Sequence, residues 1–303
     1  MQLSDFLIIG APKCGTTSLH AYLSQHPQLF MSAVKEPHFF AFEHCSPNFN
    51  GPGDNQAPLS QNSITQLSEY RHLFKEAKDG MLRGESSTMY LYLNNVPQCI
   101  KAHNSEMKLI AILRHPIDRA FSHFLHMRRE GREQLESFEE ALQAEPQRIA
   151  EGWSPAWHYR RVSCYSEQLK RYFQLFEREH LRIYLYEDWR DHPMTTLRDM
   201  FTFLEVDNTF QPDIGKKQNI SFKPKNVWLY KFLTQPNYLK KMLKDILPAS
   251  VRKPLATRAY KQNIDRPPVL TTSIRRRLMT EFEADILQLQ TLLDLDLTSW
   301  LDD

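Results

Sequence analysis

The chain has 303 residues, of which 41% are apolar and 24% are charged, and its formal net charge is +2. This composition is typical of a globular protein that can build one large α/β domain. A charge so close to zero identifies no class of partner, and the absence of an apolar run of about 18 residues argues against a membrane span.

Four cysteines are scattered along the chain without a C-x-x-C pair: Cys14, Cys45, Cys99 and Cys164. Their spacing predicts neither a zinc site nor a dense disulfide framework. The first residues lack the basic region of a secretory signal. We therefore expect a reducing, cytoplasmic setting.

Apolar runs of strand length occur in four places, the second of them weaker than the others: 6–10, 81–86, 108–114 and 181–187. The three stronger runs do not alternate apolar with polar residues, which is the pattern of strands buried on both faces of a parallel sheet. Helical patterns follow these three runs: 16–25, 117–130 and 193–204. Strands that alternate with helices predict a doubly wound α/β fold.

The remaining segments add a predicted loop at 43–63, a long amphipathic helix at 160–178 and a helix at 273–293. No composition shift marks a domain boundary. We predict a single domain over residues 1–303, with a core at 5–205 and a basic, mostly helical part at 206–303.

The segment GAPKCGTTS (10–18) follows the first strand and opens the first helix. Gly10 and Gly15 have the spacing of the glycines in a phosphate-binding P-loop. Backbone N–H groups and the helix N-terminus at such a turn form an anion site. A tight strand–helix turn without a ligand is the alternative interpretation.

An ATP or GTP site is a second alternative, but it requires a lysine directly after the second glycine, where this chain has Thr16. The lysine of the loop is instead Lys13. Glu187 and Asp188 stand where such sites place an acidic residue. Helix capping is the preferred explanation of these two residues. Cys14 is not predicted to be a phosphatase nucleophile, because His20 stands where that chemistry needs an arginine.

Arg114 ends the strand at 108–114, and Ser122 follows in the next helix. An arginine at the carboxyl end of a parallel strand lies on the ligand edge of the sheet. A guanidinium with a nearby hydroxyl suits a second phosphate, whereas an ordinary surface ion pair is the alternative. Two anion sites at two strand ends indicate a nucleotide with phosphates at both ends.

These segments resemble sulfotransferases that use 3′-phosphoadenosine 5′-phosphosulfate (PAPS). APKCGTTSLHAYLSQHP (11–27) resembles their 5′-phosphosulfate loop, and AILRHPIDRAFSHF (111–124) resembles their 3′-phosphate motif. KEPHFF (35–40) and GESSTMYLY (84–92) are similar to segments of the carbohydrate, heparan-type and related bacterial branch. LYEDW (185–189) is typical of the family.

The resemblance implies a central parallel sheet, PAPS as donor, 3′-phosphoadenosine 5′-phosphate (PAP) as product, and no metal. It implies that Lys13 contacts the sulfate and the bridging oxygen, and that Arg114 and Ser122 hold the 3′-phosphate. The loop residues expected to bind the nucleotide are Cys14, Gly15, Thr16, Thr17 and Ser18. A lysine near the leaving oxygen is physically suited to sulfuryl transfer, because the transferred group carries less charge than a phosphoryl group.

Glu85 matches the catalytic base of the heparan-type branch, and Lys35 matches a second active-site lysine. Because Glu85 ends the strand at 81–86, we expect its carboxylate to reach the cleft. His38 is the rival base. The predicted reaction is transfer of a sulfuryl group to a hydroxyl or amine, with an NTPase or kinase and a non-catalytic nucleotide-binding protein as alternatives.

The chain departs from heparan-modifying members, since no cysteine follows Cys164 and no Golgi-type anchor is visible. We therefore expect a small-molecule or sugar acceptor rather than a polymeric glycosaminoglycan. Lys216 and Lys217 lie in a basic segment that is predicted to close over the nucleotide. Residues 216–261 carry twelve Lys and Arg against one acid, which suits a lid, a membrane-surface helix or a solvated face. No nucleic-acid-binding motif accompanies this charge.

Overall fold

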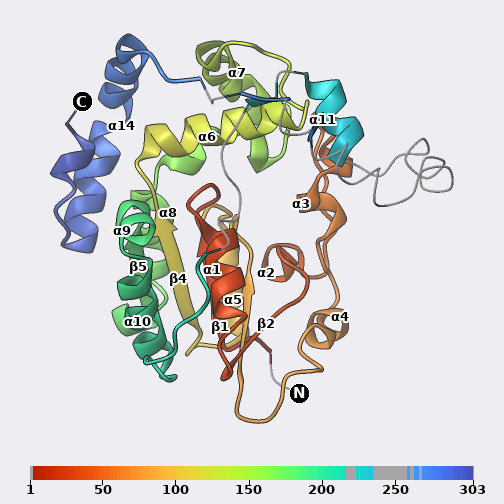
Figure 1. The fold of residues 1–303 in the computed structure, drawn as a ribbon, viewed down its shortest axis with the longest axis vertical. Coiled ribbons are helices and arrows are strands. Elements are labelled where there is room, and N and C mark those ends of the chain that lie inside the picture. Colours follow the sequence, from red (N-terminus) through yellow and green to blue (C-terminus); the bar gives the residue numbers. More distant parts are fainter. Residues whose placement is uncertain are drawn as a thin grey trace, which may run out of the picture.

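The fold is described from a computed structural model, which covers residues 3–215, 223–224, 226–234, 258–259, 263–265 and 268–302. Its central sheet consists of parallel strands: β1 (Phe6–Gly10), β2 (Leu29–Met31), β3 (Leu82–Ser86), β4 (Lys108–Leu113) and β5 (Leu181–Leu185). The order across the sheet is β2-β3-β1-β4-β5, so β1 occupies the centre (Figure 1). The predicted α/β fold with a central parallel sheet is confirmed.

The helices that connect and cover these strands follow in chain order: α1 (Thr16–Leu23), α2 (Phe39–Phe42), α3 (Pro58–Gln61), α4 (Leu67–His72), α5 (Val96–His103), α6 (Pro116–Arg129), α7 (Phe138–Ala150), α8 (Ser166–Phe173), α9 (Tyr186–Asp191), α10 (Pro193–Leu204), α11 (Val227–Thr234) and α14 (Thr272–Leu293). Short 3-10 turns complete the described part: η1 (Asp54–Gln56), η2 (Pro155–Trp157), η3 (Arg161–Ser163), η4 (Arg178–His180) and η5 (Thr298–Trp300). Figure 1 shows α6 running across the upper end of the sheet, with α7 above it.

The burial of the strands follows their place in the sheet. β1 is buried along its whole length, and β4 is buried from its second residue onward. The prediction that both are covered on two faces is confirmed. The same prediction was wrong for β5, whose residues after Leu181 are partly or fully exposed, because β5 is the edge strand and pairs on one side.

Several predicted elements differ from the structure. The helix expected at 160–178 is divided into η3 and α8, and the predicted loop at 43–63 contains η1 and α3. β5 ends at Leu185 rather than at residue 187, because α9 begins at Tyr186. β2 was missed, since three residues are too few to give a periodic pattern.

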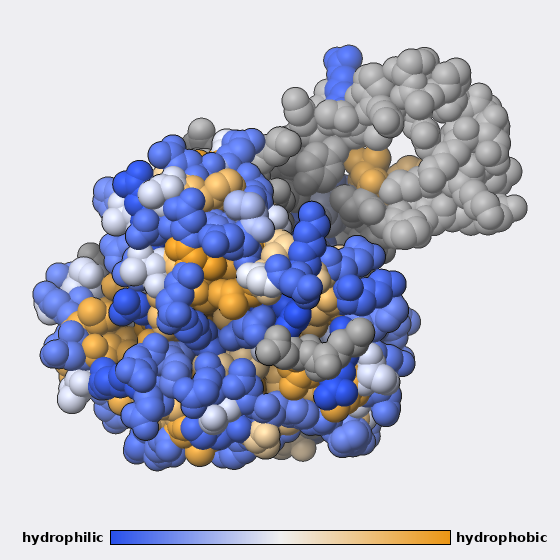
Figure 2. All heavy atoms as spheres, turned by 90° about the horizontal axis from the view of Figure 1, so that it is seen from below, coloured by the Kyte–Doolittle hydropathy of each residue, from blue (hydrophilic) through white to orange (hydrophobic). Residues whose placement is uncertain are grey.

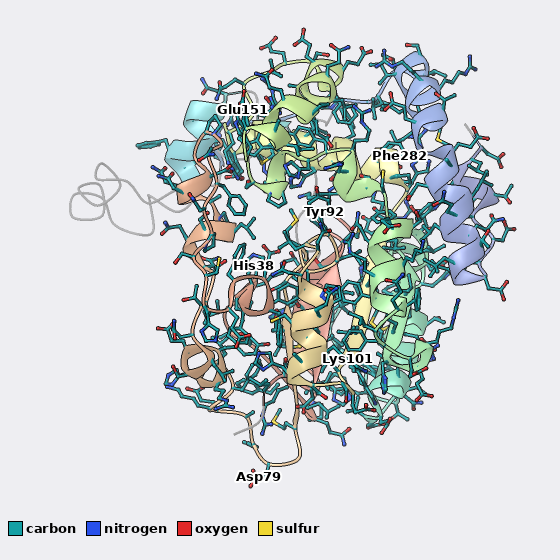
Figure 3. All side chains as sticks on the ribbon, turned by 180° about the vertical axis from the view of Figure 1, so that it is seen from behind. His38, Asp79, Tyr92, Lys101, Glu151 and Phe282 are labelled. Carbon is teal, nitrogen blue, oxygen red and sulfur yellow. The ribbon has the colours of Figure 1, made fainter. Side chains whose placement is uncertain are left out.

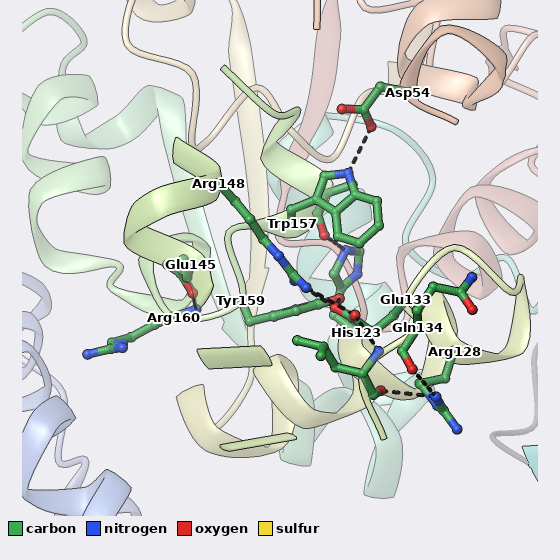
Figure 4. Close-up of polar contacts among 12 residues, drawn as sticks. Asp54, His123, Arg128, Glu133, Gln134, Glu145, Arg148, Trp157, Tyr159 and Arg160 are labelled. Carbon is green, nitrogen blue, oxygen red and sulfur yellow. Dashed lines mark hydrogen bonds and ion pairs between the residues drawn. The ribbon is translucent and has the colours of Figure 1, made fainter. Parts of the chain in front are cut away.

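A buried polar network fixes the segment after α6 to the loop before α3 (Figure 4). Asp54 is fully buried and accepts hydrogen bonds from Ser154 Oγ (2.6 Å) and Trp157 Nε1 (2.9 Å), and it pairs with Arg132. Arg148 donates to Glu133 from both terminal nitrogens, at 2.6 and 3.1 Å. Buried charges persist only when paired in this way, so the network holds these segments in one arrangement.

The C-terminal part adds α14, which packs against α6 and α8. Asp285 of α14 accepts N–H bonds from Tyr165 (2.8 Å) and Ser166 (3.1 Å) at the start of α8. A two-residue antiparallel pair joins β6 (Lys223–Pro224) to β7 (Ile264–Asp265). Lys216 and Lys217 lie outside the described residues, as does most of the basic stretch 216–261.

The face shown in Figure 2 is largely hydrophilic, with apolar side chains between the charged ones. No helix in the part of the chain that the structure describes has both the length and the apolar character needed to cross a membrane.

Candidate active site

The loop between β1 and α1 is shaped by residues in the left-handed backbone region. Gly15 has φ +80°, and a Cβ on it would lie 2.7 Å from Nε1 of Trp189. Both its conformation and its close neighbour therefore require glycine. Lys13 also has positive φ, +72°, which is uncommon for a residue with a side chain and is typical of functional turns.

Thr16, Thr17 and Ser18 form the first turn of α1, so their backbone N–H groups belong to the helix end that offers unpaired donors. Ser18 N–H bonds the carbonyl of Gly15 at 3.0 Å. Cys14 differs from its neighbours, because its thiol is fully buried and its N–H donates to Ala11 O at 3.3 Å. Burial raises the pKa of Cys14 to about 12, so the thiol stays protonated, as expected for a packed residue.

Several cations surround Lys13. Burial together with the nearby Arg129 and Arg114 guanidinium groups lowers the pKa of Lys13 to about 8, and Glu36 opposes this shift. A bound anion strongly stabilises the charged form of such a lysine, because it offsets both the loss of solvation and the repulsion by the neighbouring arginines. The site is therefore electrostatically suited to a multiply charged anion.

Arg114 follows β4 directly, next to the loop that follows β1. Its guanidinium carbon lies 4.8 Å from the ring centroid of Tyr186, and its Nη1 donates a long bond of 3.5 Å to Lys13 O. Tyr165 Oη donates to the Arg114 carbonyl at 3.0 Å, which fixes the backbone. Ser122 is partly buried in α6, the helix that begins two residues after Arg114.

Lys35, Glu36 and His38 form a second charged group in the turn before α2. Lys35 Nζ donates to Glu36 Oε1 at 3.0 Å, and Thr88 Oγ1 donates to the same oxygen at 3.1 Å. Burial favours the neutral acid, but Lys35 and His38 outweigh it, so the pKa of Glu36 is lowered. The Glu36 side chain is 27% exposed, and it remains an ionised carboxylate that solvent can reach.

His38 lies deeper, beside α2 (Figure 3), with its Nε2 3.7 Å from Glu36 Oε2. Both of its ring nitrogens are buried and have no hydrogen-bond partner among the residues described. Burial and Lys35 lower the pKa of His38 to about 4 against the opposing effect of Glu36, so the ring is neutral at pH 7. A neutral imidazole beside a carboxylate can orient an acceptor hydroxyl but binds a proton weakly.

Glu85 is fully buried on β3. Its carboxylate accepts hydrogen bonds from Ser87 Oγ (2.9 Å) and Tyr70 Oη (3.5 Å). Burial raises the pKa of Glu85 to about 7, with the Glu36 charge adding to the shift. Neighbouring strand residues point to opposite faces, and Ser86 contacts His20 of α1 at 2.9 Å, so Glu85 faces away from α1.

A carboxylate other than the predicted one acts electrostatically on Lys13. Glu36 contributes to the electrostatics of Lys13, whereas Glu85 is enclosed by Tyr70, Ser87 and Tyr90. Sequence reasoning missed Glu36 and Arg129. Glu36 could have been found, because it lies in the KEPHFF segment, which resembles the sulfotransferase family. Arg129 could not, because it lies within an ordinary helical pattern.

The two acidic residues that suggested an NTPase lie in a helix. Glu187 and Asp188 lie in the first turn of α9 instead of at the end of a strand. Acidic side chains are favoured at that position by the positive end of the helix dipole. This location supports the capping interpretation.

The comparisons with known proteins agree with this geometry. The model of the family described as "Sulfotransferase domain" matches residues 3–227. Carbohydrate sulfotransferase 15 of Mus musculus is 25% identical over 246 residues, covering 67% of this chain and 44% of that protein. Heparan sulfate glucosamine 3-O-sulfotransferase 3B1 of Homo sapiens is 29% identical over 123 residues, covering 41% of this chain and 26% of that protein. The chain thus spans less than half the length of these curated relatives.

Among solved structures, a sulfotransferase from Alicyclobacillus acidocaldarius is similar over the whole of both chains. The TM-score is 0.78 and the sequence identity is 30%. The sequence-based prediction of a sulfotransferase is confirmed, and the NTPase alternative is not favoured. Since the family model matches 225 consecutive residues, 3 to 227, of the 303 in the chain, this protein belongs to the sulfotransferase family.

Proposed function

We propose that the protein transfers a sulfuryl group from PAPS to a hydroxyl or amine of a carbohydrate or small-molecule acceptor. Two observations carry the proposal. Lys13 and Arg114 follow the neighbouring strands β1 and β4, with Arg114 Nη1 3.5 Å from Lys13 O. Glu36, whose N–H donates to Ser86 O at the end of β3, acts electrostatically on Lys13. Two cations and a carboxylate in one place supply charge stabilisation for a donor and a base for an acceptor.

The residues present fit an adenine nucleotide with phosphates at both ends. Thr16 and Thr17 would offer their N–H groups at the start of α1 to a 5′-phosphate, together with the hydroxyls of Thr16, Thr17 and Ser18. Arg114 and Ser122 would hold the 3′-phosphate. Lys13 would stabilise the negative charge that develops on the leaving oxygen. Its burial and the arginines near it favour the binding of an anion at this place.

Glu36 is the base that we propose for the acceptor, with Lys35 and His38 beside it. It is ionised and partly exposed, whereas Glu85 is sealed and is held closer to neutrality. The role of Glu85 as base, which the sequence predicted, thereby becomes the competing proposal. The carbohydrate names of the relatives support a sugar acceptor, and the cytoplasmic setting stays a prediction.

Calorimetry with PAP and with ADP·Mg²⁺ tests the donor class. We expect tight, metal-independent binding of PAP and weak binding of ADP. Tighter binding of ADP that depends on Mg²⁺ would support the NTPase alternative instead. Acceptor screening with labelled PAPS, read by mass, tests the reaction, and PAP binding without transfer to any acceptor would favour a non-catalytic nucleotide-binding protein.

A further inference from the structure

A second group of chemically active side chains lies between α2 and α5, apart from the residues proposed for sulfuryl transfer. Cys99 and His103 are four residues apart on α5, so they share one face of the helix. Glu43 directly follows α2, which packs against α5. The sequence spacing gave no sign of this group, because Glu43 is distant from α5 along the chain.

The three side chains converge on one point. His103 Nε2 donates to Glu43 Oε2 at 2.7 Å, and Cys99 Sγ donates to the same oxygen at 3.4 Å. The three potential ligand atoms all lie within 4.8 Å of one another. Ligands of a tetrahedral zinc lie about 3 to 4 Å apart, given bonds of about 2.0 to 2.3 Å, so small side-chain rotations bring these atoms to that spacing.

We propose that Glu43, Cys99 and His103 form a Zn²⁺ site that joins α2 to α5. Sulfur, imidazole nitrogen and carboxylate oxygen together are the ligand set that zinc prefers, whereas Mg²⁺ and Ca²⁺ require oxygen ligands. Water or His44 supplies the fourth ligand, since His44 Nε2 lies 3.6 Å from Glu43 Oε1 and its side chain is 74% exposed.

Charge balance favours a divalent ion at this place. On binding, the Cys99 thiol releases its proton to solvent, Glu43 binds as the carboxylate, and His103 binds through Nε2, which gives up its proton to solvent or to Nδ1 so that the remaining ring proton is on Nδ1. The two negative ligand charges then cancel the charge of Zn²⁺, which suits a site flanked by Phe39 and Phe40, each with its ring centroid 5.7 Å from that of His103. The site is also reachable, because the side chains of Glu43 and His103 are 15% and 19% exposed.

A reactive cysteine is the main rival interpretation of the group. A catalytic thiol needs a base that is placed to remove its proton. Here Glu43 rather than His103 contacts the thiol, so no histidine is placed for that role. Metal binding explains why these three residues lie together better than a catalytic cysteine does.

The site has a structural consequence for the segment that carries Glu36 and His38, because α2 begins directly after His38. A metal that joins the end of α2 to α5 would restrict the movement of the segment that carries Glu36 and His38. We expect bound Zn²⁺ to raise the thermal unfolding midpoint of the protein.

Competition with a chromophoric zinc chelator tests the proposal on the whole chain. We expect one equivalent of Zn²⁺ to bind, and Cys99→Ser to weaken its binding by at least about 100-fold, since residues that only orient ligands already cost about 10- to 100-fold. Cys45→Ser is the matched control, because Cys45 is exposed and outside the group, and it should bind as the unmodified protein does. Failure of the protein to compete with the chelator, or equal losses in the two variants, overturns the site.

Cobalt(II) supplies a readout that does not depend on stability. We expect the protein loaded with Co²⁺ to show a thiolate-to-cobalt absorption band that Cys99→Ser abolishes and that His103→Gln weakens. A band that persists in Cys99→Ser would place the metal on another cysteine and reject the proposed ligands.

Discussion

The Nζ atom of Lys35 lies 3.0 Å from Oε1 of Glu36, so the carboxylate that we propose as the base is held in an ion pair. Lys35 keeps Glu36 ionised despite its partial burial, and the neutral His38 ring lies 3.7 Å from the same carboxylate. A carboxylate held ionised beside a lysine is ready to accept a proton but is not free to leave its position.

Glu36→Gln should lower kcat by about 10²- to 10⁴-fold, the usual contribution of a general base, while PAP affinity stays nearly unchanged. Glu85→Gln is the comparison, because it removes the competing carboxylate, and it should keep most of the transfer rate. Steady-state transfer assays with PAP calorimetry measure both effects. If Glu85→Gln abolishes transfer and Glu36→Gln does not, the base is the residue that the sequence predicted.

The stability of the protein should depend on pH through Glu85. Its pKa is raised to about 7 in the folded protein against 4.5 in the unfolded chain, so folding favours the neutral acid. That contribution is fully present below pH 4.5 and is lost as the pH rises through about 7. Glu85→Gln should therefore gain up to about 3 kcal/mol relative to the unmodified protein between pH 4.5 and pH 8.

Denaturant unfolding at a series of pH values measures this difference. Glu69→Gln is the control, because Glu69 is exposed on α4 and should leave the profile unchanged. A stability difference that stays constant across this pH range would show that Glu85 is ionised in the folded protein.

PAP affinity should fall as the pH rises through about 8, because the pKa of Lys13 is lowered to about 8 and the uncharged amine no longer attracts the phosphates. Above that pH the affinity should drop by up to about tenfold per pH unit until the bound lysine also titrates. Calorimetry above pH 7, where the phosphates are fully ionised, measures the trend. Lys13→Arg keeps its charge and should remove the dependence; an unchanged slope in that variant would assign the titration to another group.

Arg114→Ala should weaken PAP binding by about 10- to 100-fold, the value of one charge-assisted contact to a phosphate. Binding of adenosine 5′-phosphate, which lacks the 3′-phosphate, should change little. Arg182→Ala is the control, because this arginine of β5 is about half exposed and pairs with Asp199. Equal losses for both nucleotides would reject the assignment of Arg114 to the 3′-phosphate.

Much of the fold was predictable, because the signals were local. β1 and β4 are continuous apolar runs, and α10 and α14 have clear helical periods, so each could be read from neighbouring residues. The prediction of one helix over 160–178 was wrong because the first residues of this segment bond to other elements. Arg160 and Arg161 donate their N–H groups to Glu145 of α7, and Tyr165 donates to Asp285 of α14.

The sequence by itself determined the anion cradle, because Gly10, Lys13, Gly15 and the hydroxyls after them are contiguous and the turn that they form is local. Only the tertiary structure distinguishes the surroundings of the two candidate carboxylates. Glu85 is the next-to-last residue of β3, and the alternation of side chains along the strand directs it into the interior beside Tyr70 and Tyr90. Glu36 reaches the site from a left-handed turn, φ +59°, that no periodic pattern reveals. The sequence names the candidate acids, whereas strand alternation and backbone turns, which depend on the whole fold, decide how far each one is buried.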